Sequence, residues 1–123
     1  MKKILGLAAG MLLTIATFAQ GSVTFLDANS NYDKTAVTSF NFEFSPEFTV
    51  DQINKAAEFY TSYFTVTPVA SPAGITVTVK LVEDNEMARR VITRFFVTLE
   101  VQKILVNGES YLMSDFAAKY LML

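Results

Sequence analysis

Chemistry in this chain rests on carboxylates, amines, guanidinium groups and hydroxyls, because histidine and cysteine are both absent. The sequence therefore lacks the usual general base at neutral pH, the thiolate nucleophile and nearly every zinc, copper or haem ligand set. Glu43 and Glu100 could transfer protons as a carboxylate pair. Cross-strand ion pairing with Lys80 is the simpler interpretation. We expect no catalytic residue, no metal site and no cofactor, and hence no enzyme.

A group of arginines is the main candidate for binding. Arg89, Arg90 and Arg94 lie within six consecutive positions. If this stretch is a strand, Arg90, Arg94 and Phe96 share one solvent-facing side, where they would bind an acidic or carboxylated partner. Guanidinium groups bind carboxylates through two hydrogen bonds, and an exposed aromatic ring adds an apolar anchor. A solvated face balanced by nearby glutamates is the alternative.

Residues 27–33 carry oxygen-bearing side chains at alternate positions, as calcium-binding loops do. However, Tyr32 stands where such a loop needs glycine, and Thr38 stands where it needs a bidentate glutamate. The sequence therefore favours a polar linker without a metal.

The first residues have the layout of a secretory signal peptide. Lys2 and Lys3 precede an uncharged apolar run from Ile4 to about Phe18, and Ala19 provides a small residue for cleavage. Roughly 15 apolar residues are too few for a helix that crosses a bilayer. We predict a signal peptide at residues 1–19 and an exported chain, periplasmic or extracellular, with no stable membrane span after cleavage. No cysteine is present, so the chain is not a lipoprotein.

The remaining residues are enough for one domain with one hydrophobic core. We divide them into a flexible N-terminal arm at residues 20–34, with a possible short edge strand, and a single α+β domain at residues 35–123. Eight basic and twelve acidic residues remain once Lys2 and Lys3 are removed. This mildly acidic balance argues against binding to nucleic acid.

Two strands and one helix are well marked. Residues 35–45 alternate between Phe40, Phe42, Phe44 and polar neighbours, which predicts a half-buried strand. Residues 74–82 alternate in the same way, with a threonine-rich opposite side.

The segment between these two strands predicts a helix. Thr49 and Gln52 have the spacing of a capping box, and the apolar positions that follow lie on one helical face as far as Phe64. Pro68 and Pro72 then prevent a longer helix.

Residues 87–106 fit two periods. A helix could start near Asn85, but the β-branched and aromatic residues alternate, and we favour a strand. Asn107 and Gly108 predict a tight hairpin turn. A short helix should follow over residues 115–121, capped by Ser114.

The predicted order is β-α-β-β-(short hairpin)-α. It implies an antiparallel-rich sheet with helices on one face, most simply a ferredoxin-like plait with a right-handed crossover from the first main strand to the second.

The function expected from these features is an exported, non-enzymatic binding or interaction module of the bacterial cell envelope that engages an envelope or extracellular protein. One alternative is a carrier with an apolar pocket between helix 50–64 and the phenylalanine side of the sheet. Another is an exported protease inhibitor that presents the hairpin at residues 106–109. Phe48, Phe59 and the C-terminal residues 120–123 could mark a homodimer surface.

Overall fold

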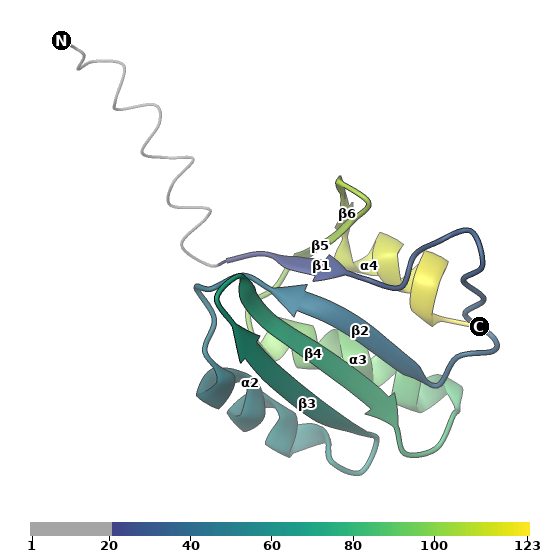
Figure 1. The fold of residues 1–123 in the computed structure, drawn as a ribbon. Helices are drawn as coiled ribbons and strands as arrows, with labels where there is room; N and C mark the ends of the chain where they lie inside the picture. The colour runs from purple at the N-terminus through teal and green to yellow at the C-terminus, as the bar shows by residue number, and fades with distance from the viewer. Residues whose placement is uncertain (1–20) are drawn as a thin grey trace, which may run out of the picture.

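The computed structural model describes residues 21–123, so the predicted signal peptide at residues 1–19 lies outside the described residues. These residues form an α+β domain in which one mixed sheet is covered on one face by three helices (Figure 1). The strands are β1 (Val23–Phe25), β2 (Ser39–Phe44), β3 (Phe64–Ser71), β4 (Gly74–Leu81), β5 (Lys103–Val106) and β6 (Glu109–Leu112). The helices are α2 (Val50–Ala57) with a 3₁₀ turn η1 (Glu58–Tyr60), α3 (Glu86–Thr98), and α4 (Met113–Phe116) with a π-helical turn η2 (Ala117–Leu121).

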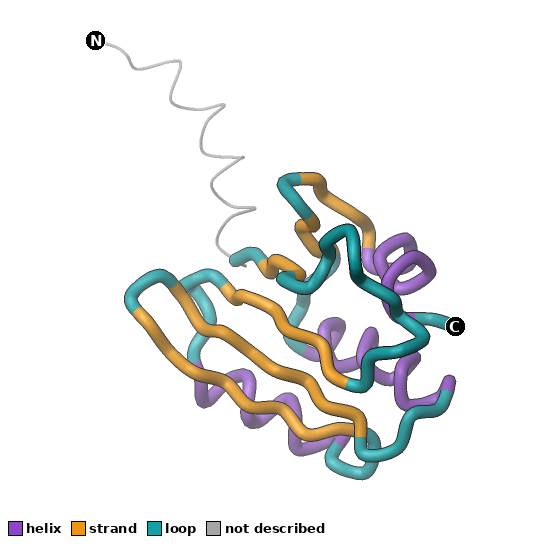
Figure 2. Tube along the Cα trace, turned by 45° about the vertical axis from the view of Figure 1, so that its right-hand side comes forward, coloured by secondary structure: helices purple, strands orange, loops and turns teal. Residues whose placement is uncertain are grey.

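The sheet has the strand order β3-β4-β2-β1-β5-β6, and only β1 and β5 run parallel. The predicted alternation of β2 is confirmed, since Phe40, Phe42 and Phe44 are completely buried. In β4 they lie opposite three further buried side chains, Val79, Val77 and Ile75. The other face of these strands carries the threonines and charged residues, and no helix covers it (Figure 2).

Helix α2 begins as predicted. The Thr49 hydroxyl accepts from the Gln52 amide at 3.0 Å, and the Gln52 side chain accepts from the Thr49 amide at 3.3 Å, so the capping box is complete. The helical segment ends at Tyr60 rather than near Phe64, because Phe64 is the first residue of β3.

Strand β3 was not predicted. The position of Pro68 in the ladder explains why this strand tolerates a proline. The Val82 amide donates to the Tyr63 carbonyl at 3.0 Å, so this pair of residues is hydrogen-bonded. Hydrogen-bonded and non-hydrogen-bonded pairs alternate along an antiparallel ladder, which puts Pro68, opposite Val77, at a position without such bonds. Its nitrogen points to the free edge of the sheet, so no ladder bond is lost.

The extra strand changes the topology from the prediction. The chain crosses from β2 through α2 to β3, and β4 then lies antiparallel to β2, whereas a crossover directly to residues 74–82 was expected. The ferredoxin-like plait is not reproduced as such, because β1 lies between β2 and β5.

The N-terminal segment also differs from the expected arm with an edge strand. Strand β1 is internal to the sheet, and Val23 and Phe25 are buried in the core. The Phe25 ring packs against Phe42 in β2 and Phe116 in α4, with ring centroids 5.3 and 5.2 Å apart.

The strand predicted over residues 87–106 is wrong, because most of this stretch forms helix α3. The Asn85 side chain caps the helix by accepting from the Ala88 amide at 2.8 Å. The buried residues follow helical spacing and cover the phenylalanines of the sheet, with Phe96 only 4.9 Å from Phe42 between ring centroids. Burial of this apolar face outweighs the preference of β-branched residues for strands.

The C-terminal part is close to the prediction. Asn107 and Gly108 both have positive φ, 51° and 86°, which confirms the predicted turn between β5 and β6. Helix α4 begins at Met113, with Leu112 at the N-cap position and no side-chain cap, so Ser114 lies inside the helix and does not cap it.

Candidate functional site

The predicted arginine group is divided by helix α3. Arg90 and Arg94 are exposed on the outer side of the helix, and Arg90 contacts Glu86 at 3.7 Å. Phe96 is completely buried in the core and cannot form a surface with them. This corrects the expectation of one flat face with an aromatic anchor. Binding of an acidic partner by Arg90 and Arg94 stays a prediction.

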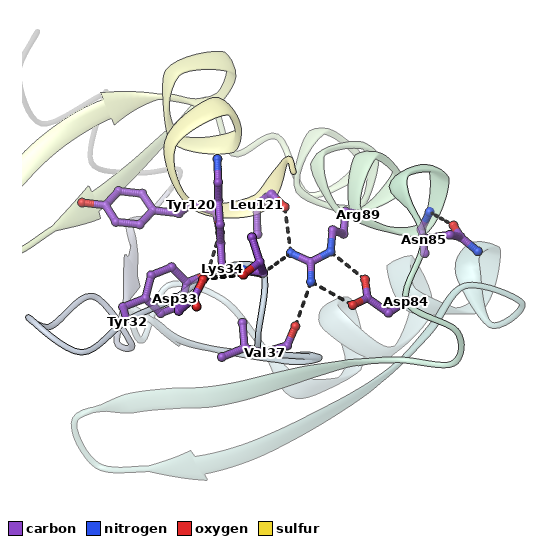
Figure 3. A network of polar contacts seen from close by, with 11 residues as sticks. Tyr32, Asp33, Lys34, Val37, Asp84, Asn85, Arg89, Tyr120 and Leu121 are labelled. Carbon is purple, nitrogen blue, oxygen red and sulfur yellow. Dashed lines mark hydrogen bonds and ion pairs between the residues drawn. The ribbon is translucent and has the colours of Figure 1, made fainter.

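Arg89 makes more polar contacts than any other described side chain, although none of its atoms is exposed (Figure 3). Its Nε and Nη2 donate to the two carboxylate oxygens of Asp84 at 2.8 and 3.2 Å. Its remaining N–H groups donate to the carbonyls of Lys34, Val37 and Leu121 at 2.7 to 2.9 Å. All five donors are used, so Arg89 has no group left for a ligand.

Side chains in the same region also form hydrogen bonds to the C-terminal residues of the chain. The Tyr32 hydroxyl donates to the Tyr120 carbonyl at 2.6 Å, and the Lys34 amine donates to the Ala118 carbonyl at 3.0 Å. With Arg89, these side chains satisfy carbonyls that a final helical turn leaves free. Burial raises the pKa of the Tyr32 phenol above its usual value, so the phenol stays protonated and can donate. The cluster is structural.

We predict that Arg89→Ala lowers the free energy of unfolding by about 3–5 kcal/mol, because it leaves Asp84 and three carbonyls without their donor. Urea unfolding followed by circular dichroism measures the change. Arg90→Ala is the matched control, and it should change stability by about 0.5 kcal/mol or less, since Arg90 is exposed. Equal effects of the two substitutions would contradict the structural role.

The Arg89 guanidinium holds the pKa of Asp84 below its ordinary range. A carboxyl with a lowered native pKa stabilises the fold at pH values above its unfolded pKa, about 3.9, and loses this contribution as pH falls through the native pKa. We therefore predict that Asp84→Asn destabilises the protein at pH 7, and that the difference from wild type shrinks towards pH 3. Urea midpoints at both pH values test this. A difference that does not depend on pH would refute it, and Glu83→Gln serves as the control.

The other sequence candidates do not form a site. Glu43 lies on the open face of the sheet and Glu100 follows the end of α3, so they make no pair. In the loop considered for calcium, the Asp27 carboxylate accepts from the Asn41 amide at 2.8 Å, and Asp33 accepts from Thr35. Among residues 21–123 no three acidic side chains come together as metal ligands would.

The space considered for an apolar ligand is filled. Phe40, Phe42 and Phe44 have no exposed area, and Phe95 and Phe96 from α3 pack in the same core as Ile53 from α2. Interiors at normal packing density leave no room for a ligand.

Phe59 is the exception among the phenylalanines. Nine of the ten in residues 21–123 are exposed by 4% or less, whereas Phe59 is 74% exposed. It follows α2 in the turn η1, beside Tyr60, whose hydroxyl lies 2.6 Å from the Thr98 hydroxyl of α3. The exposed ring of Phe59 is therefore the candidate contact residue in this part of the chain.

The surface around Phe59 continues across the end of α3. One hollow of about 390 Å³ has Phe59 and Leu99 in its wall, and a second of about 550 Å³ lies on the other side of the helix end. We call the whole region the α3-end surface, and its apolar residues are Ala56, Phe59, Val97, Leu99, Val101, Leu112 and Met113. Val97 and Leu112 are 64% and 54% exposed.

Between the two hollows the chain leaves α3 through a Schellman motif. The Val101 amide donates to the Phe96 carbonyl and the Glu100 amide to the Val97 carbonyl, both at 2.9 Å. This places Glu100 in the left-handed conformation, with φ 63°, where glycine is the usual residue. A left-handed φ costs a side-chain-bearing residue roughly 1–2 kcal/mol. A carboxylate at the negative end of a helix is also unfavourable.

We predict that Glu100→Gly raises the free energy of unfolding by about 1 kcal/mol, because glycine adopts this φ without steric cost. The midpoint of thermal unfolding should rise. Glu100→Ala is the control, since alanine removes the charge and keeps the backbone strain. An increase as large with alanine as with glycine would show that the backbone conformation is not the cause.

Sequence reasoning identified Phe59 as an edge residue and placed Glu100 on the solvent-facing side of a strand, but it did not predict that Val97 is exposed or that Glu100 lies at a helix end. Their position depends on α3 being a helix that ends at Thr98, and the alternating pattern concealed it. A glutamate at a position where a helix end usually has glycine is informative only when the end of the helix is known.

Comparison with known proteins gives no match to a family model, a curated protein or a solved structure. No helix within residues 21–123 has the length and apolar character needed to cross a bilayer. The α3-end surface is therefore the feature from which a function is inferred.

Proposed function

We propose that this protein is an exported, non-enzymatic binding module that engages a protein partner in the cell envelope or outside the cell. The contact is made through the α3-end surface. Export is inferred from the N-terminal signal-peptide pattern and the absence of enzymatic activity from the lack of a catalytic side-chain set.

The exposure of Phe59 is the observation that carries the proposal. Aromatic rings at the centre of a contact surface contribute most when a partner excludes water from them. Here the ring stands beside a hollow whose wall includes Leu99, and polar side chains of Gln52, Lys55 and Thr98 surround it. An apolar centre with a polar rim is the usual anatomy of a protein interface.

We predict that Phe59→Ala abolishes capture of the partner while the free energy of unfolding changes by about 0.5 kcal/mol or less, because the ring is exposed. The measurement compares proteins crosslinked to the tagged mature chain in cells that produce it. Val69→Ala is the matched control, since Val69 is also exposed, by 60%, but lies opposite Thr76 on the face of the sheet that no helix covers. Identical captured proteins with wild type and Phe59→Ala would refute the proposal.

A further inference from the structure

We propose that the segment recognised by the α3-end surface is apolar and positively charged, and that Glu100 is the residue that selects its charge. This inference rests on the proposed function, because it names the chemistry of the partner at the same surface.

The two hollows provide the apolar contacts of the proposed recognition. They lie on either side of the last turn of α3, and each is bounded by exposed apolar side chains, Phe59 in one and Val97 with Leu112 in the other. Leu99 lines the first hollow and its neighbour Glu100 lines the second, so a segment laid across the helix end can place one apolar side chain in each hollow and pass close to Glu100.

The charge of the surface comes from the residues that line the hollows. Lys55 is 3.6 Å from Asp51, so this cation already has a partner. Glu58 and Glu100 form no ion pair with any residue in the described part of the chain. Arg90 lies in the first half of α3 and Arg94 lies one turn before Thr98, and neither they nor Lys103 line a hollow. Among the residues that line the two hollows, the charge without an ion-pair partner is negative, which complements a lysine or arginine of the partner.

The backbone at Glu100 supports a recognition role. A left-handed φ and a carboxylate at a helix C-terminus both disfavour the folded state, and no ion pair within residues 21–123 compensates the Glu100 carboxylate. The conformation holds Glu100 in the wall of one hollow, and its neighbour Leu99 lies in the wall of the other. Backbone strain of this kind is typical of binding sites.

A library of displayed random peptides tests the proposal, with the chain lacking residues 1–19 as the target. Peptides that bind wild type but not Phe59→Ala are sequenced. We expect apolar peptides enriched in lysine and arginine, with binding that weakens about tenfold in Glu100→Gln and falls with rising salt. Glu83→Gln, which removes an exposed carboxylate near the other end of α3, should leave binding unchanged.

Glu100→Gly separates recognition from structure. It should raise the melting temperature and still weaken binding about tenfold, a combination that a purely structural residue does not give. Selected peptides without an excess of basic residues, or binding insensitive to Glu100→Gln, would overturn the inference while leaving the proposed function intact. If no selected peptide depends on Phe59, or if light scattering shows a second copy of this chain on the surface, the proposed function fails as well.

Discussion

The buried guanidinium of Arg89 is the interaction on which the arrangement of this domain depends. A charged group that is buried away from solvent is tolerated only when it is paired with an opposite charge and fully hydrogen-bonded. Arg89 meets this condition by joining the turn before α3, the loop that leads into β2 and the last residues of the chain. Helix α3 is thereby fixed against the sheet at its first turns, and the position of its far end follows from that.

The α3-end surface is a consequence of this fixed helix. Phe96 packs on Phe42 of β2 and Phe95 packs on Phe64 of β3, so the helix lies on the sheet with one side buried. Phe59 comes from a different element and lies at the same end because Tyr60 is hydrogen-bonded to α3. The proposed binding surface therefore needs both the core and the Arg89 contacts to be in place.

Local signals in the sequence were sufficient for several elements and insufficient for others. The alternation of β2, the capping box at Thr49 and the turn at Asn107 are set by neighbouring residues, and each was predicted correctly. Strand β3 can form because the nitrogen of Pro68 faces away from β4. Helix α3 forms because its apolar face is buried against the folded sheet. The local pattern of residues 87–106 fitted both a helix and a strand, and only packing against the sheet decides between them. The fold class was therefore predictable and the α3-end surface was not.

The position of Pro68 also affects the exposed edge of the sheet. Strand β3 forms an outer edge whose outward-facing amides include those of Val66 and Ala70. Between them, Pro68 has a nitrogen without a hydrogen and cannot donate to another chain. A strand that approached this edge would lose a hydrogen bond at its centre. The opposite edge, β6, has only four residues. Growth of the sheet into a fibril is therefore hindered on both sides.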